Sequence, residues 1–288
     1  MKFVYLSLTL LLLAVPFADA SDRFGAWRAL NIDNTLLMQL KSGDVVIELA
    51  PQFAPKHVRN IKSLVSEGYF DGSAIIRSQD NYVVQWGDPN FDNDKAKSLG
   101  SAAKKIDVEF FAKPKGIDFQ RIESRDAYAD EVGFVDGFPV ASDGKQAWLT
   151  HCYGMVGVSR DVASDSGNGS GLYVVTGHAP RHLDKNVTLV GRVVKGMELL
   201  SSLPRGSGDL GFYETQDEYI EVRSIDLIKG TELAKKLLSL QIMRTQSDEF
   251  KQHVGKRTTR SETWFLEPTG RIELCNVGVP SKLDTSIE

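Results

Sequence analysis

The chain has 288 residues, of which 42% are hydrophobic and 25% are charged, and these proportions are typical of a globular protein rather than a disordered, fibrous or multi-span membrane protein. Its formal net charge of −4 has the wrong sign for binding nucleic acid through an electropositive surface. We therefore expect no nucleic-acid partner.

The first twenty residues differ in character from the rest of the chain. Lys2 precedes an apolar run over residues 3–17, and Ala18-Asp19-Ala20 follows as an A-x-A cleavage site. The run is shorter than the roughly 20 apolar residues that cross a membrane. Residues 1–20 are therefore predicted to be a cleaved signal peptide. The mature chain would begin at Ser21 with a lead-in over residues 21–35 and would contain no membrane span.

From residue 36 onward, short runs of β-branched and aromatic residues alternate with turn signals. Leu37–Leu40 and Val45–Leu49 flank a Gly-containing turn and predict a hairpin. Further strands are predicted at Ser73–Arg77, Tyr82–Gln85, Met155–Val158, Leu172–Thr176, Thr188–Val193 and Tyr219–Ile228. Many short strands with few helices favour a closed antiparallel sheet. We therefore expect a mostly β fold, an eight-stranded barrel.

Two helices are predicted to cap this barrel. Val58, Ile61 and Leu64 recur at helical spacing after Pro55, and Gly68 follows as a C-cap, which indicates a helix with one buried face. A second short helix is predicted within Val194–Leu203.

Two regions do not fit the barrel pattern. Residues 90–147 are charged and rich in Gly and Asp, and they are too long for an ordinary loop, so an insertion with partial structure is predicted. Residues 230–288 form a C-terminal extension that is expected to be partly helical. Its predicted features are an amphipathic helix through Leu233, Leu237, Leu240 and Met243, a basic stretch over Lys251–Arg260, and a strand-like end near Trp264–Val277. The basic stretch is interpreted as a solvated helix face rather than a binding site.

Cys152 and Cys275 are the only cysteines of the chain. An oxidising compartment permits a disulfide between them, whereas two buried free thiols are the alternative, and the sequence leaves both open. A disulfide would tie the C-terminal segment to the main domain.

Several patterns that suggest chemistry fail when their context is considered. Residues 206–211 satisfy G-x-G-x-x-G, but they follow a predicted helix and precede a strand, the reverse of a dinucleotide site. His178 and His182 have i,i+4 spacing, yet a proline lies between them and no further ligands are near, so no metal site is predicted. Cys152 beside His151 suggests a thiol nucleophile, but neighbouring residues of a strand point to opposite faces.

One set of sequence blocks survives this test, through its order and spacing. Its members are Val45-Val46-Ile47-Glu48-Leu49, residues 54–60, Gly68-Tyr69-Phe70-Asp71-Gly72, Arg77, residues 84–89, Gly154-Met155-Val156, residues 169–174, Leu183-Asp184 and residues 190–197. Together they resemble the cyclophilin-type peptidyl-prolyl cis-trans isomerases over about residues 36–229, interrupted by the insertion. Within that family, the sequence blocks most resemble those of the exported cyclophilins of Gram-negative bacteria.

The resemblance implies an isomerase that needs no cofactor or metal. It also implies a monomer in the periplasm that acts on proline-containing unfolded or partly folded proteins. The rival hypothesis is a non-catalytic module or chaperone that binds proline segments on the same scaffold. A hydrolase is a distant third, because the sequence offers no convincing nucleophile and base.

Arg77 matches the catalytic arginine of the family. Rotation about a peptide bond meets a barrier of about 18 to 20 kcal/mol, and a rigid, permanently charged donor can stabilise the twisted amide more than the planar one. Under strict strand alternation Arg77 would share a face with Ile75, so a salt bridge at the barrel edge is the alternative interpretation.

The resemblance also implies the residues that bind substrate. Tyr82 and Val83 match the floor of the proline pocket, Tyr173 a further wall and Leu183 a final apolar contact. Gln85 matches the glutamine that orients the arginine. For each aromatic residue taken alone, ordinary core packing is the alternative.

The chain departs from the family pattern at several of these positions. Ile75-Ile76 stands in place of Phe-His, Gly171 in place of a second glutamine, and Trp86 in place of a glycine. Ser159-Arg160-Asp161 replaces an Asn-containing segment, and His182 stands where cyclosporin-sensitive members carry tryptophan. We expect retained isomerase chemistry, altered substrate contacts at these positions, His182 included, and weak cyclosporin binding.

Overall fold

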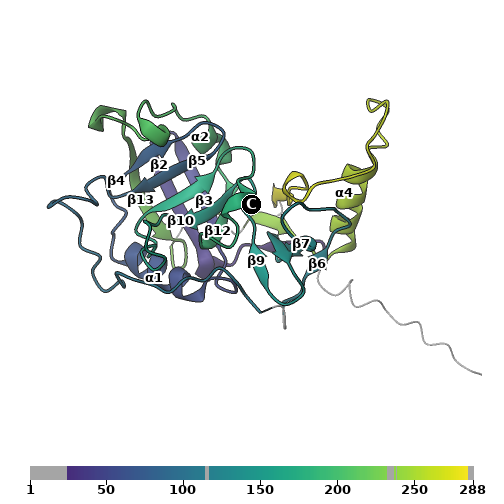
Figure 1. Cartoon of the computed structure of the whole chain (residues 1–288), viewed down its shortest axis with the longest axis horizontal. Helices are drawn as coiled ribbons and strands as arrows, with labels where there is room; N and C mark the ends of the chain where they lie inside the picture. Colours follow the sequence, from purple (N-terminus) through teal and green to yellow (C-terminus); the bar gives the residue numbers. More distant parts are fainter. Residues whose placement is uncertain (1–24, 114–116, 232–236, 238, 285–288) are drawn as a thin grey trace, which may run out of the picture.

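Figure 1 shows the computed structural model of the chain, which describes residues 25–113, 117–231, 237 and 239–284. Eight antiparallel strands close into a barrel in the order β10-β11-β5-β4-β13-β2-β3-β12. Their bounds are β2 Thr35–Leu40, β3 Gly43–Leu49, β4 Ser73–Ser78, β5 Val83–Gly87, β10 Met155–Val158, β11 Leu172–Val175, β12 Leu189–Lys195 and β13 Ile220–Leu227. The predicted mostly β, closed eight-stranded barrel is confirmed. The predicted signal peptide, residues 1–20, lies outside the described residues.

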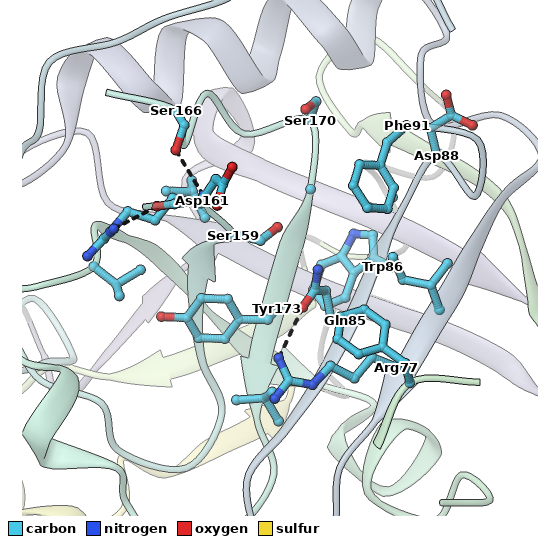
Figure 2. Close-up of a pocket in the computed structure, with 18 of the residues that line it drawn as sticks. Arg77, Gln85, Trp86, Asp88, Phe91, Ser159, Asp161, Ser166, Ser170 and Tyr173 are labelled. Atoms are coloured by element: carbon cyan, nitrogen blue, oxygen red, sulfur yellow. Dashed lines mark hydrogen bonds between the residues drawn. The ribbon is translucent and has the colours of Figure 1, made fainter. Parts of the chain in front are cut away.

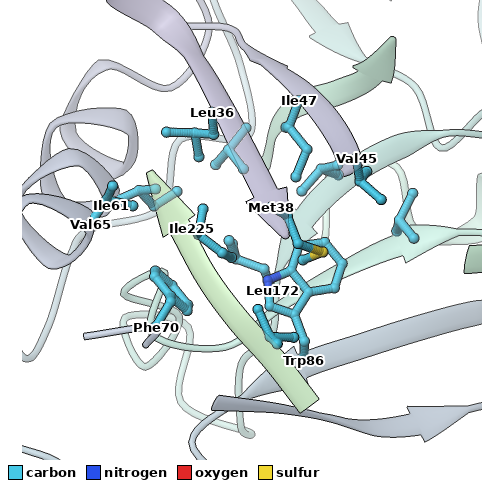
Figure 3. Close-up of a cluster of buried hydrophobic side chains, with 14 of the residues drawn as sticks. Leu36, Met38, Val45, Ile47, Ile61, Val65, Phe70, Trp86, Leu172 and Ile225 are labelled. Atoms are coloured by element: carbon cyan, nitrogen blue, oxygen red, sulfur yellow. The ribbon is translucent and has the colours of Figure 1, made fainter. Parts of the chain in front are cut away.

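The barrel strands are apolar on both faces because each face packs on a different core. Along β2, Leu36 and Met38 point into the barrel, whereas Leu37 between them belongs to a second cluster outside it. Figure 3 shows the inner cluster, in which Trp86 is fully buried. The outer face of β2 packs against the C-terminal extension through Ile242. Because both faces of these strands are buried, their sequences are nearly continuous apolar runs.

Helix α1, Pro55–Ser66, begins and ends by different means. At its C-terminus, the Gly68 N–H donates to the Val65 carbonyl and the Tyr69 N–H to the Leu64 carbonyl, with Gly68 at a φ of 68°. This Schellman arrangement requires the left-handed conformation that glycine adopts without strain, so the predicted C-cap is confirmed. At the N-terminus, the Glu109 carboxylate accepts from backbone N–H groups of the first turn, so the inserted region completes this helix.

The remaining regular structure lies beside the barrel. Helix α2 spans Met197–Ser201 and lies within the range predicted for the second helix. Within the described residues, a four-stranded sheet, a three-stranded sheet, helix α4 and five short 3₁₀ helices make up the rest (Figure 1). Their bounds are β6 Gln120–Arg121, β7 Glu131–Val135, β8 Phe138–Ser142, β9 Ala147–Leu149, β1 Trp27–Ala29, β14 Leu240–Met243, β15 Ser281–Leu283, α4 Asp248–Thr259, η2 Ile32–Asn34, η3 Arg181–Leu183, η4 Asp209–Gly211, η5 Gln216–Glu218 and η6 Leu274–Asn276. In the described part of the chain, no helix has the length and apolar character that crossing a bilayer demands.

Two predictions for the C-terminal extension are wrong. Residues 240–243 form strand β14, not a helix, because Leu240 and Ile242 alternate onto the outer face of the barrel; the earlier part of the expected helix, including Leu233, lies outside the described residues. The strand expected near Trp264–Val277 is absent from the described residues there, and Trp264 is 81% exposed. The helical basic stretch is observed within α4.

The two cysteines are joined. Cys152 and Cys275 form a disulfide across 123 positions of sequence, so the bridged alternative is the one that the structure contains. The bond links the segment before β10 to the C-terminal extension.

A buried charge cluster joins the N-terminal segment to the barrel. Arg28 binds Glu48 through two hydrogen bonds of 2.7 and 3.0 Å, and Arg192 donates to the same carboxylate at 3.2 Å. Burial opposes ionisation of Glu48, but Arg192 and Arg28 outweigh it, so the pKa of Glu48 is lowered.

Replacing Glu48 with glutamine is expected to lower the free energy of unfolding by about 3 kcal/mol at pH 7, because two buried guanidinium groups lose their counter-charge. Since the folded pKa of Glu48 is lowered, its stabilisation is complete above the ordinary glutamate pKa of about 4.3 and is lost as the pH falls through the folded value. Urea unfolding of both proteins at several pH values checks this. A difference that stays constant into the acid range contradicts it.

Candidate active site

A cleft of about 820 Å³ lies on the outside of the barrel, beside strands β4, β5 and β11. Six of the seven residues predicted to form the site line it: Arg77, Tyr82, Val83, Gln85, Tyr173 and Leu183. The seventh, His182, is not a lining residue; its ring stacks on Tyr82 with centroids 6.3 Å apart and planes within 6°. The structure therefore places His182 at the exposed surface beside Tyr82, and not among the residues that line the cavity.

Arg77 reaches this cleft because strand β4 contains an irregularity. Ile75 pairs with Trp86 and Arg77 with Gln85, so the register shifts between Ile75 and Arg77. Ile75 and Trp86 point into the barrel core, while Arg77 and Gln85 line the cleft. The expectation that Arg77 would share the face of Ile75 is wrong for this reason.

The Arg77 guanidinium is held by neutral groups. Its Nε donates to the Leu210 carbonyl at 2.7 Å, Nη1 donates to Gln85 Oε1 at 3.5 Å, and Nη2 donates to Gln79 Oε1. Figure 2 shows the side chain pointing toward Gln85. Among the described residues no carboxylate pairs with Arg77, so the salt bridge considered from the sequence is not observed. Three of its five N–H groups have an acceptor within the described part of the chain, which leaves two for a ligand.

The surroundings of Arg77 are aromatic. Its guanidinium carbon lies 5.1 Å from the ring centroid of Phe212 and 5.8 Å from that of Tyr82. Burial lowers the pKa of Arg77, but a guanidinium remains charged at neutral pH. A cation fixed at an aromatic wall can interact strongly with a lone pair brought beside it.

Next to the arginine, apolar side chains pack together along one side of the cleft. Val83, Tyr173 and Val175 pack as one buried cluster, with Tyr82 and Val187 against it. Figure 2 shows Tyr173 on the wall beside Gln85. Trp86, which replaces a family glycine, is fully buried in the barrel core and also borders the cleft.

Phe212 lines the cleft but was not among the residues predicted from the sequence. Its backbone forms a β-bridge with Arg77 and its ring lies against the guanidinium, although 135 positions separate the two. It follows directly on the glycine-rich stretch 206–211, which is a turn between α2 and β13 as predicted. That turn also supplies the Leu210 carbonyl to Arg77. No local motif indicates this contact, because the two residues lie far apart in the sequence and meet only in the folded chain.

Replacing Phe212 with alanine is expected to lower kcat/KM for a proline peptide by about tenfold, since cation–π contacts of this kind contribute about 0.5 to 2 kcal/mol. Steady-state isomerisation rates measure the change. Phe111→Ala, a partly exposed phenylalanine outside the cleft, is the control and is expected to match wild type. Equal rates for Phe212→Ala and wild type would remove Phe212 from the site.

Cys152 and His178, which other sequence patterns singled out, do not line the cleft. Cys152 is bonded to Cys275 and is no nucleophile in this state. His178 is exposed, and no cluster able to hold a metal ion occurs among the described residues.

Comparisons with known proteins match the region that builds this cleft. Residues 35–225 match the family model described as "Cyclophilin type peptidyl-prolyl cis-trans isomerase/CLD". A probable peptidyl-prolyl cis-trans isomerase of Brucella suis is 29% identical over 209 residues, which cover 72% of this chain and 86% of the relative, and a Brucella abortus protein of the same name matches to the same extent. The crystal structure of cyclophilin AquaCyp293 from Hirschia baltica has the same fold, with a TM-score of 0.66, 22% identity, and coverage of 90% of this chain and 94% of that chain.

Proposed function

Since the chain belongs to the cyclophilin-type peptidyl-prolyl cis-trans isomerases, we propose that it catalyses the cis-trans isomerisation of X-Pro bonds in exported, unfolded proteins, with Arg77 as its catalytic residue. The observation that carries the assignment of Arg77 is its guanidinium, which lines the cleft beside aromatic side chains, has no carboxylate partner among the described residues and keeps N–H groups for a ligand.

In this mechanism the proline ring enters the pocket formed by Val83, Tyr173 and Leu183. As the amide twists, its resonance is lost and the proline nitrogen gains a lone pair, to which an Arg77 N–H donates. This contact is stronger in the twisted state than in the planar one, so it lowers the barrier to rotation. No bond is cleaved, and the chain's own residues suffice for each step.

The Gln85 side chain has a positioning role in this mechanism. Its Oε1 accepts from Arg77, which orients the guanidinium across strands β4 and β5. A fixed donor needs no reorganisation during the twist, and this is the source of its advantage over water.

Two features support exported clients. The apolar run over residues 3–17 with its A-x-A site is typical of a signal peptide, and the Cys152–Cys275 disulfide suits an oxidising compartment such as the periplasm. Fractionation of the producing cells and N-terminal sequencing test this. A mature chain that begins at Ser21 and fractionates with periplasmic markers is expected, whereas an uncleaved cytoplasmic chain would contradict export.

The activity is tested on the refolding of a small protein whose folding rate is limited by prolyl isomerisation. Catalytic amounts of the chain are expected to accelerate the slow phase, which otherwise takes tens of seconds or more. If the chain binds the unfolded protein at stoichiometric amounts and does not accelerate this phase, it is a proline-segment chaperone and the proposal fails.

A further inference from the structure

We propose that His151 is a positioning residue for the proline pocket: it fixes the ring of Tyr173, and residues outside the barrel fix His151 in turn. The proposal rests on the function proposed above for the cleft, and it adds a role for the inserted region.

The contact between His151 and Tyr173 is fully enclosed. The Nε2 atom of His151 lies 2.8 Å from the Tyr173 hydroxyl, and the two rings stack with centroids 6.2 Å apart and planes within 10°. His151 has no exposed surface, and Tyr173 is only 6% exposed although its ring lines the cleft. Across the sheet, Tyr173 lies opposite Gly157, where an added Cβ would clash with the phenol. The ring therefore has one defined place, with its hydroxyl directed away from the cavity.

The orientation of His151 is set by Asp184. Its Oδ1 atom accepts from the backbone N–H of His151 at 2.9 Å and lies 2.8 Å from ring atom Nδ1. A carboxylate can only accept, so Nδ1 carries a hydrogen, and in the neutral ring Nε2 is free to accept from the Tyr173 hydroxyl. Burial raises the pKa of Tyr173, which keeps that hydroxyl protonated and able to donate.

Asp184 is itself anchored to the inserted region. Arg181 donates through Nε to Asp184 Oδ2 and binds Asp126 with two parallel bonds of 2.8 and 3.1 Å. The side chains of Arg181 and Asp126 are 3% and 4% exposed. The 3₁₀ turn that begins at Arg181 also carries Leu183, a cleft residue, so one buried network holds two walls of the pocket.

This network has a consequence for binding. Without a partner at His151, the buried phenol would lose its hydrogen bond, a cost that rotation of the ring toward the cleft would relieve. The rotated ring would occupy space intended for proline. Loss of His151 is thus expected to weaken substrate binding more than it slows the twist of bound substrate.

The test is a double-mutant cycle of His151→Asn and Tyr173→Phe. The asparagine amide can still donate to Asp184, but it is too short to reach Tyr173. We expect His151→Asn to raise both KM and the Kd of a proline tetrapeptide about tenfold with kcat within about twofold, because one lost buried hydrogen bond has this magnitude. In the Tyr173→Phe background, where no hydroxyl needs a partner, His151→Asn is expected to have less than a twofold effect. His178→Asn, an exposed histidine, is the control.

Unchanged Kd for His151→Asn, or an equal effect in both backgrounds, overturns the proposal. If circular dichroism shows that His151→Asn does not fold, Asp126→Asn against the exposed control Asp130→Asn gives the same cycle, with a smaller rise in Kd that also vanishes with Tyr173→Phe. Because Kd needs no turnover, the cycle decides the role of His151 even if wild type accelerates no isomerisation, an outcome that would sink the proposed function alone.

Discussion

Replacing Arg77 with alanine is expected to lower kcat/KM for a proline peptide by about a hundredfold or more. Removing a fixed donor that acts on developing charge or a lone pair costs about 2.7 kcal/mol or more in well-studied sites. The loss should fall on kcat, because the apolar pocket of Val83, Tyr173 and Leu183 is left in place. Steady-state kinetics of peptide isomerisation measure both parameters.

Two further variants define what Arg77 supplies. Arg77→Lys keeps the charge but loses the planar fork that contacts Gln85 and Leu210 together, so it is expected to recover only a small part of the activity. Arg205→Ala removes an exposed ion pair with Asp80 outside the cleft and is expected to match wild type. An Arg77→Ala protein that retains activity within about threefold of wild type contradicts the catalytic assignment.

Removing the disulfide is expected to produce the largest loss of stability. The bond between Cys152 and Cys275 closes a loop over 123 positions, and the chain-entropy model gives about 4 to 5 kcal/mol for a loop of this length. We therefore expect the Cys152→Ala, Cys275→Ala double variant to unfold at much lower urea concentration than wild type. The C-terminal extension should be the first region to lose protection in hydrogen exchange, because the bond ties it to the segment before β10.

Urea unfolding under reducing conditions provides the control. A reducing agent should destabilise wild type to about the level of the double variant and leave the double variant unchanged. A difference below about 1 kcal/mol between oxidised wild type and the double variant would show that the bond contributes little, against the chain-entropy expectation.

The barrel strands were predictable because their apolar runs are short and bounded by turn residues. The hairpin of β2 and β3 and the end of α1 at Gly68 both follow from local signals, and both are observed. The C-terminal extension was harder. Leu240 and Met243 fit a helical spacing, but burial of Leu240 and Ile242 on the barrel's outer face makes this segment a strand. Tertiary packing overrode the local pattern, and the spacing of residues along the chain does not show that packing.

In the site too, some residues could be predicted from the sequence and others could not. Arg77, Gln85 and Tyr173 lie in sequence blocks whose order carries the family resemblance, so they could be identified without coordinates. Phe212 and His151 could not, since each meets its partner through the closure of the barrel and not through spacing along the chain. His151 was considered only as a neighbour of Cys152, where strand alternation argued against joint chemistry. Its premise was wrong, because His151 and Cys152 lie between β9 and β10 and not in a strand, and it gave no indication of the hydrogen bond to Tyr173.

The central claim is that Arg77 catalyses cis-trans isomerisation of an X-Pro bond bound in this cleft. Exchange NMR of an Ala-Pro peptide at equilibrium tests this claim most directly. With catalytic wild-type protein we expect cross-peaks between the cis and trans proline signals within a mixing time of about a second, far faster than the uncatalysed tens of seconds. With Arg77→Ala those cross-peaks should vanish while the peptide still binds. Binding by wild type without any exchange, or equal exchange with both proteins, would contradict the account.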